Sequence, residues 1–194
     1  MADTVALDDL RDEVLRKIGR NIVNFQKMEA MLKLLNTQQA ISGSMSDLSR
    51  IAAKAKKTTA QQPMGRLADA FIRSVYSSEP AVAGHESVKE ISVTFSLRIE
   101  ADPALIAERR RALRSVVKER NKLVHQWLAS FDPNSLESCK TLAADLDEQH
   151  ARIWPEFETL RTIVMAVREC QREAGRYLAS DAFVAELGRS RAGV

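Results

Sequence analysis

The chain has 194 residues, of which 45% are apolar and 28% charged, and it carries a formal charge of +3. This composition predicts one folded, mildly basic domain over residues 1–194 and excludes an intrinsically disordered chain. The acidic N-terminus has no apolar signal-peptide core, and no apolar run is long enough to cross a membrane, so we expect a cytoplasmic protein with no membrane partner.

Residues 7–36 predict a long amphipathic helix, and residues 46–100 predict an insertion that follows it. Helical spacing within the insertion indicates two short helices, at 48–57 and 64–76, separated by the sequence TTAQQP. Residues 91–99 alternate apolar and polar side chains, which is typical of a β-strand. This strand needs a partner, and the pattern leaves two open: residues 80–86, or the same strand of a second copy.

The second half of the chain predicts three further long helices, over residues 103–129, 135–154 and 156–176, and a short one over 179–187. Asp102 and Pro103 provide an N-cap and a first helical residue. Asn134 and Glu137 have the spacing of a capping box for the next helix. Pro155 is expected to kink or restart the helix. The whole pattern predicts an all-α fold, an antiparallel bundle of four to five helices.

The chemically informative residues lie in the helix at 103–129. Arg120 projects from its apolar face, Asn121 follows, and His125 ends a basic stripe. The four cations of that stripe, called the basic stripe below, are Arg111, Arg114, Lys118 and Lys122. A solvated helix face is the simplest interpretation of it, and binding of phosphates is the alternative. Glu29, on the apolar stripe of the first helix, requires a partner if it is buried, and Arg120 is the candidate.

The residues Arg120-Asn121-Lys122-Leu123-Val124-His125 resemble the signature of HEPN-domain proteins, in which four to six residues separate an Arg from a His and the residue directly after the Arg is often polar. The resemblance implies a bundle of four to five helices that forms a homodimer and cuts RNA without a metal ion. It further implies that Arg120 and His125 are catalytic and that Asn121 supports them. The insertion at 46–100 is not part of the minimal family pattern.

The chemistry of these side chains suits such a reaction. A histidine near its ordinary pKa serves as acid or base, and an arginine binds phosphate oxygens. On an ideal helix Arg120 and His125 point about 140° apart, so a single straight helix does not bring them to one phosphate. A two-fold dimer would bring the residues of both subunits into one cleft. The basic stripe would then hold the RNA backbone.

The resemblance also suggests a toxin or phage-defence role, with an antitoxin or inhibitor protein as a partner. Many toxins of this family carry a tyrosine two residues after the His, which an antitoxin modifies with AMP, but this chain has Trp127 there. The chain contains no Gly-rich phosphate loop, HExxH or Cys-pair motif, so no cofactor or metal is expected. Two alternatives remain: a non-catalytic dimerisation module that binds a protein or nucleic acid through the basic stripe, and a DNA-binding helix-turn-helix at 46–77.

Overall fold

The computed structural model describes residues 2–38, 40–44, 47–78, 92–96 and 98–192. These residues are predominantly helical, which confirms the all-α class. The chain divides into two compact units, Met1–Leu160 and Arg161–Val194. The site considered below lies entirely within the first unit. Across the described residues, no helix combines the length and apolar character needed to span a membrane.

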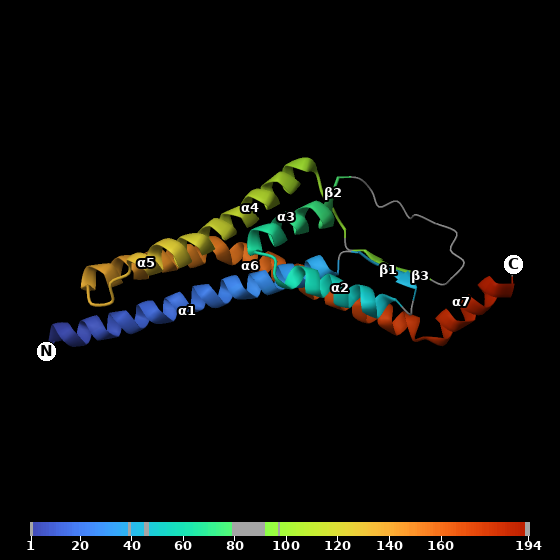
Figure 1. The fold of residues 1–194 in the computed structure, drawn as a ribbon, viewed down its shortest axis with the longest axis horizontal. Coiled ribbons are helices and arrows are strands. Elements are labelled where there is room, and N and C mark those ends of the chain that lie inside the picture. The colour runs from blue at the N-terminus through green and yellow to red at the C-terminus, as the bar shows by residue number, and fades with distance from the viewer. Residues whose placement is uncertain (1, 39, 45–46, 79–91, 97, 193–194) are drawn as a thin grey trace. The chain divides into compact units, whose positions relative to one another are not determined.

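Three long helical stretches form the framework of the described chain (Figure 1). They are α1 (Ala2–Thr37), α4 (Pro103–Lys122) with its extensions η1 (Leu123–Trp127) and α5 (Leu128–Ser130), and α6 (Leu136–Leu178). The short connection between α5 and α6 makes α4 antiparallel to α6. In contrast, α1 and α6 run parallel, because pairs such as Lys17–Asp147 and Asn24–His150 ascend together along both helices. Among these three framework helices, α4 therefore runs antiparallel to the other two.

α6 passes through Pro155 without ending, so the two helices predicted at 135–154 and 156–176 are one. Proline removes the N–H that would bond to the carbonyl of Ala151. Both Pro155 and Ala151 are solvent-exposed, so water can hydrate that carbonyl and the helix can continue. The chain closes with α7 (Asp181–Ala192), longer than the predicted 179–187.

The insertion contains more structure than its sequence predicts. Its helices are α2 (Leu48–Ala60) and α3 (Met64–Val75). β3 (Ser92–Ser96) pairs antiparallel with β1 (Ala40–Ser44), a segment in which we predict no strand from the sequence. Neither expectation named β1 as a partner of this strand. Residues 80–86 lie outside the described residues, and pairing with a second copy stays a prediction. A second, parallel pair joins β2 (Tyr76–Ser77) to β4 (Ile99–Glu100).

The break predicted at TTAQQP also occurs later than expected. The hydroxyls of Thr58 and Thr59 donate to the carbonyls of Lys54 and Ala55, one turn earlier, and α2 continues to Ala60. Only residues 61–63 therefore separate α2 from α3. α3 buries one side, including Leu67, Phe71 and Val75, as its spacing predicts. It packs against both α1 and α4.

The helix starts agree with the sequence at one position and differ at another. Asp102 caps α4, since its Oδ1 accepts a 2.8 Å hydrogen bond from the N–H of Leu105. α6 is capped by Ser135, whose Oγ accepts from the N–H of Ser138 at 3.2 Å. The predicted cap, Asn134, instead donates its own N–H to Asp132 at 2.9 Å. The Asx turn at Asp132 engages Asn134 before the helix begins.

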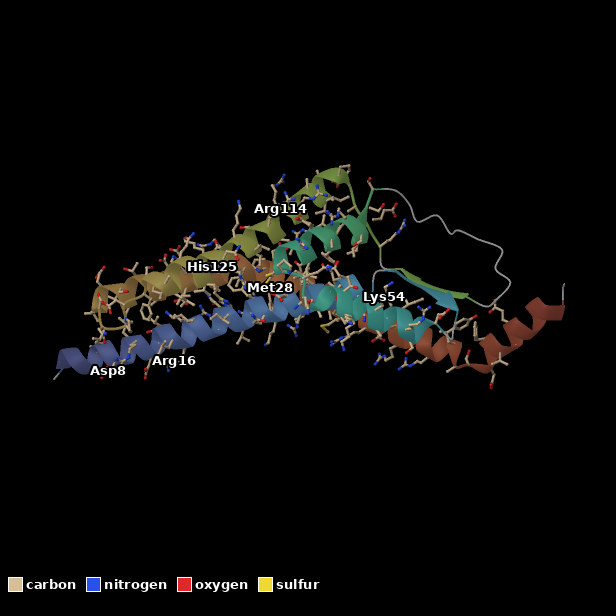
Figure 2. All side chains as sticks on the ribbon, viewed as in Figure 1. Asp8, Arg16, Met28, Lys54, Arg114 and His125 are labelled. Atoms are coloured by element: carbon tan, nitrogen blue, oxygen red, sulfur yellow. The ribbon has the colours of Figure 1, made fainter. Side chains whose placement is uncertain are left out.

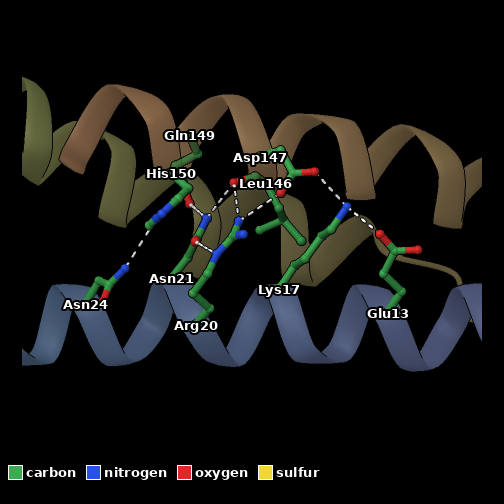
Figure 3. Close-up of polar contacts among 9 residues, drawn as sticks. All are labelled: Glu13, Lys17, Arg20, Asn21, Asn24, Leu146, Asp147, Gln149 and His150. Carbon is green, nitrogen blue, oxygen red and sulfur yellow. Dashed lines mark hydrogen bonds and ion pairs between the residues drawn. The ribbon is translucent and has the colours of Figure 1, made fainter.

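Two fully buried amides, Asn21 and Gln149, connect the framework helices. Asn21 Nδ2 donates to the Leu146 carbonyl at 2.8 Å and to Gln149 Oε1 at 3.1 Å (Figure 3). Gln149 Nε2 then donates to Glu119 of α4, to its carbonyl at 2.9 Å and to its carboxylate at 3.1 Å. A single side chain of α6 thus bonds to both α1 and α4.

We expect Gln149→Leu to lower the free energy of unfolding by about 1–3 kcal/mol, because it removes buried hydrogen bonds and leaves their partners unpaired. Chemical denaturation measures this loss. Arg50→Ala is the control: Arg50 is exposed and pairs with Asp47 on the surface, so its removal should change stability by less than about 0.5 kcal/mol. Equal effects of the two substitutions would contradict a structural role for Gln149.

Candidate functional site

The helix that carries the HEPN-like sequence widens into a π-helical turn, η1, at Leu123–Trp127. The N–H of Leu128 donates to the carbonyl of Leu123, five residues earlier. Lys122 and Trp127, also five apart, meet there, with the Lys122 Nζ 4.5 Å from the centre of the Trp127 ring. Residues five apart point about 140° apart on an ideal α-helix, so this contact shows how far the turn departs from that geometry.

The widened turn changes the orientation of His125, which lies in its middle. A π-turn accommodates one extra residue, so it rotates the residues after it back by as much as about 100°, and a residue within it, such as His125, by part of that angle. That rotation reduces the 140° that would separate Arg120 from His125 on a straight helix. His125 is exposed and forms no hydrogen bond with any residue that the structure describes. Figure 2 shows its position on η1, further along the same helical stretch as Arg114 of α4.

Arg120 and Asn121 bind each other. Arg120 Nη1 donates to Asn121 Oδ1 at 3.1 Å, and the other guanidinium N–H groups have no acceptor within the described part of the chain. Arg120 is half-buried and Asn121 exposed. The structure shows no direct bond between Arg120 and His125. What it provides is an arginine with unused donors one helical turn before an exposed imidazole.

The predicted ion pair between Glu29 and Arg120 does not form. Glu29 instead accepts a 2.7 Å hydrogen bond from Lys33, four residues later on the same helix. This local pair forms readily because residues four apart are neighbours on a helix surface. Glu29 nevertheless lies close to Arg120, because both line one cavity.

This cavity, called the Arg120 cavity below, has a volume of about 440 Å³ and opens to the surface. Its walls come from three parts of the chain. They are Glu29 and Lys33 of α1, residues 60–65 at the turn between α2 and α3, and Val117, Arg120 and Asn121 of α4. The sequence indicates Glu29, Arg120 and Asn121 as site residues. It does not indicate Lys33 or the α2–α3 turn, since nothing local in those segments shows that they meet α4.

The basic stripe does not behave as one surface. Arg111 and Lys118 are exposed and form no ion pair with any described residue. Arg114 pairs with Asp69 of α3 at 3.1 Å, and the carboxylate offsets the positive charge of the guanidinium at this point of the surface. Lys122 lies over Trp127. Two of the four side chains therefore have no partner of their own in this part of the chain.

Glu119, the residue before Arg120, holds the motif in place through its contacts with α6. Arg152 Nε donates to Glu119 Oε1 at 2.9 Å, and Gln149 donates to the same carboxylate. Burial favours the neutral acid, but the hydrogen bonds from Arg152 and Gln149 outweigh it and hold the pKa of Glu119 below its ordinary value of 4.5. Because Glu119 immediately precedes Arg120, this anchored carboxylate restrains the backbone from which Arg120 projects.

Comparisons with known proteins provide no family assignment: no family model matches the chain, and no match is found among curated proteins or solved structures. Among the described residues, no three His, Cys, Asp or Glu side chains cluster so that they could hold a metal ion. The candidate site is therefore defined by its own residues.

The lowered pKa of Glu119 predicts a pH dependence of stability. A carboxyl whose pKa is lower in the folded state stabilises the fold above its unfolded pKa, and this contribution is lost as the pH falls below about 4.5. Denaturation of wild type and Glu119→Gln should therefore show a stability difference that is greatest near pH 7 and shrinks toward pH 3. Parallel pH curves for the two proteins would contradict this role.

Gly65, in the first turn of α3, provides a second stability prediction. A Cβ at this position would meet only Val117 Cγ1, at an ordinary 3.7 Å. The backbone φ is not positive, so Gly65→Ala should raise the free energy of unfolding by about 0.4–1 kcal/mol. Gly19→Ala, on the open surface of α1, is the matched control with a similar expected gain. A loss of stability at Gly65 alone would show that the cavity wall does not accept a methyl group.

Proposed function

We propose that this protein is a metal-independent endoribonuclease of the HEPN type, which cuts RNA at a composite site in a homodimer, as a toxin or in phage defence. The observation that carries the proposal is the exposed His125 on the π-turn, five residues after an arginine with unused donors. An imidazole without a partner in the described chain is available to a ligand or to a second subunit.

The proposed reaction uses the ribose 2′-OH as its nucleophile. One imidazole takes the 2′ proton while the oxygen attacks the adjacent phosphorus, and the bond to the 5′-oxygen of the next nucleotide breaks. The leaving oxygen receives a proton from a second acid, for which His125 of the other subunit is the candidate. The guanidinium of Arg120 stabilises the charge on the phosphorane, and Asn121 orients Arg120. The products are a 2′,3′-cyclic phosphate and a 5′-hydroxyl.

The features around His125 also support dimerisation. Val124 is an exposed apolar residue directly before His125, and the half-buried Trp127 and Leu128 lie in the same segment. An apolar residue exposed next to the histidine can be covered by a second copy. Arg111 and Lys118 then remain available for the RNA backbone.

The alternative is a helical module that binds a partner or nucleic acid through the basic stripe without cutting it. Arg111 and Lys118 favour it, because they form no ion pair with any described residue and attract phosphates whether or not a reaction follows. In this case RNA affinity depends on these two residues and is insensitive to His125.

The proposal predicts RNA cleavage in EDTA by the wild-type protein. His125→Ala should lower the rate by at least about 10²-fold, the usual contribution of a general acid or base, and Arg120→Ala should also lose activity. Gln126→Ala, an exposed neighbour on the same π-turn, is the matched control and should cut like wild type. Mass spectrometry of the fragments identifies the cyclic phosphate, and sedimentation measures the dimer.

The outcomes separate the two hypotheses. Equal cleavage by all four proteins would mean a contaminating nuclease or another site and would refute the assignment to Arg120 and His125. Absence of cleavage, together with RNA binding that falls in Arg111→Ala and Lys118→Ala but not in His125→Ala, would favour the binding module.

A further inference from the structure

The Arg120 cavity joins the proposed catalytic helix to the insertion. Arg120 and Asn121 form one wall, Lys33 of α1 another, and the α2–α3 turn the third. Its volume of about 440 Å³ falls in the range of sites that enclose a small ligand. Arg120 and Asn121 have roles in the proposed reaction, but the cavity residues of α1 and of the α2–α3 turn have none.

The lining provides the three kinds of contact that a nucleotide requires. The cations Arg120 and Lys33 suit its phosphate, although the Lys33 ammonium is shared with Glu29. Met64 and Val117 are apolar and suit the face of a base. Gln61 and Gln62 carry amides, which have both a donor and an acceptor and can pair with the edge of a base.

The two glutamines have no structural task that would explain their side chains. Neither amide forms a hydrogen bond with any residue in the described ranges, and Gln62 is half-buried while Gln61 is exposed. By contrast, the buried Gln149 uses its amide in three hydrogen bonds. Two adjacent unpartnered amides at a cavity that also holds Arg120 are well placed to recognise a ligand.

We propose that the Arg120 cavity binds one nucleotide of the RNA, next to the phosphate held by Arg120, and that Gln61 and Gln62 select its base. This inference rests on the proposed ribonuclease function and adds a determinant of substrate choice to it. The α2–α3 turn belongs to the insertion, so the base preference originates outside the HEPN-like sequence. Arg120 contributes both to base selection and to the proposed reaction, because it lines the cavity and lies five residues before the exposed His125 on the same helical stretch.

A cleavage assay tests base selection. RNA oligonucleotides that differ only in the base on either side of one cut site are incubated with wild type, Gln61→Ala, Gln62→Ala and the control Gln126→Ala. Wild type and the control should prefer one base at one position. At least one cavity variant should lose about tenfold or more of that preference, because a bidentate amide contact contributes a discrimination of this order. Its kcat/KM on the disfavoured bases should stay unchanged, which a merely damaged fold would not produce.

A binding assay keeps this inference separate from the ribonuclease proposal. The variant His125→Ala, with and without Gln61→Ala or Gln62→Ala, is titrated with AMP, GMP, CMP, UMP and short RNA by calorimetry. The glutamine substitutions should weaken binding of one nucleotide and of RNA containing it. If the wild type cuts no RNA but this base-dependent binding is found, the nucleotide site stands and the ribonuclease proposal fails.

Three results would overturn the inference while leaving the ribonuclease intact. The first is cleavage by wild type without any base preference. The second is a preference that both glutamine variants retain, with unchanged nucleotide binding. The third is a mononucleotide that binds at the cavity and changes the rate but not the cut-site preference, which would make the ligand a free nucleotide rather than part of the substrate.

Discussion

The buried amide of Gln149 is the contact on which the rest of the framework depends. It accepts from Asn21 of α1 and donates to Glu119 of α4, so it satisfies its own polar atoms only when α1, α4 and α6 are all in register. Apolar side chains tolerate small slips along a helix, but a buried amide that loses its partner costs about 1–3 kcal/mol. A cluster of Lys17, Arg20 and Asp147 extends the same register to the surface, where each contact contributes less.

The same contact reaches α4 just before its hydrogen-bonding pattern changes. The N–H of Leu123 is shared between the carbonyls of Arg120 and Glu119, and Gln149 donates to the Glu119 carbonyl as well. A side chain that bonds to a helix carbonyl is a recognised cause of local distortion in a helix. The amide that aligns the helices therefore lies where α4 passes into the π-turn, and this turn sets the direction of His125. Glu119 links the framework to the candidate site, because it bonds to Gln149 and immediately precedes Arg120.

The candidate site draws on two parts of the chain with different roles. α4 provides a short run of residues whose chemistry suits a phosphate, and the insertion provides a wall of amide and apolar side chains. α3 makes this possible, because it packs against both α1 and α4 and so holds the α2–α3 turn beside Arg120. A chain with the motif but without the insertion would keep the proposed chemistry and lack this wall. In the present chain, the proposed catalysis and the proposed substrate choice reside in separate segments, α4 and the insertion, which meet at Arg120.

The sequence by itself determined the all-α class, the approximate extent of the helices, the Asp102 cap and the position of Arg120, Asn121 and His125 on one helix. These features depend on periodicity and capping within a few residues, so the local sequence is sufficient to predict them. Only the tertiary structure decided that α6 continues through Pro155, that β3 pairs with β1, that Glu29 bonds to Lys33, and that residues 60–65 meet Arg120. Each of these depends on solvent access or on partners elsewhere in the folded chain. The π-turn belongs with them, because it lies next to a carbonyl that accepts a hydrogen bond from Gln149, thirty residues further along the chain.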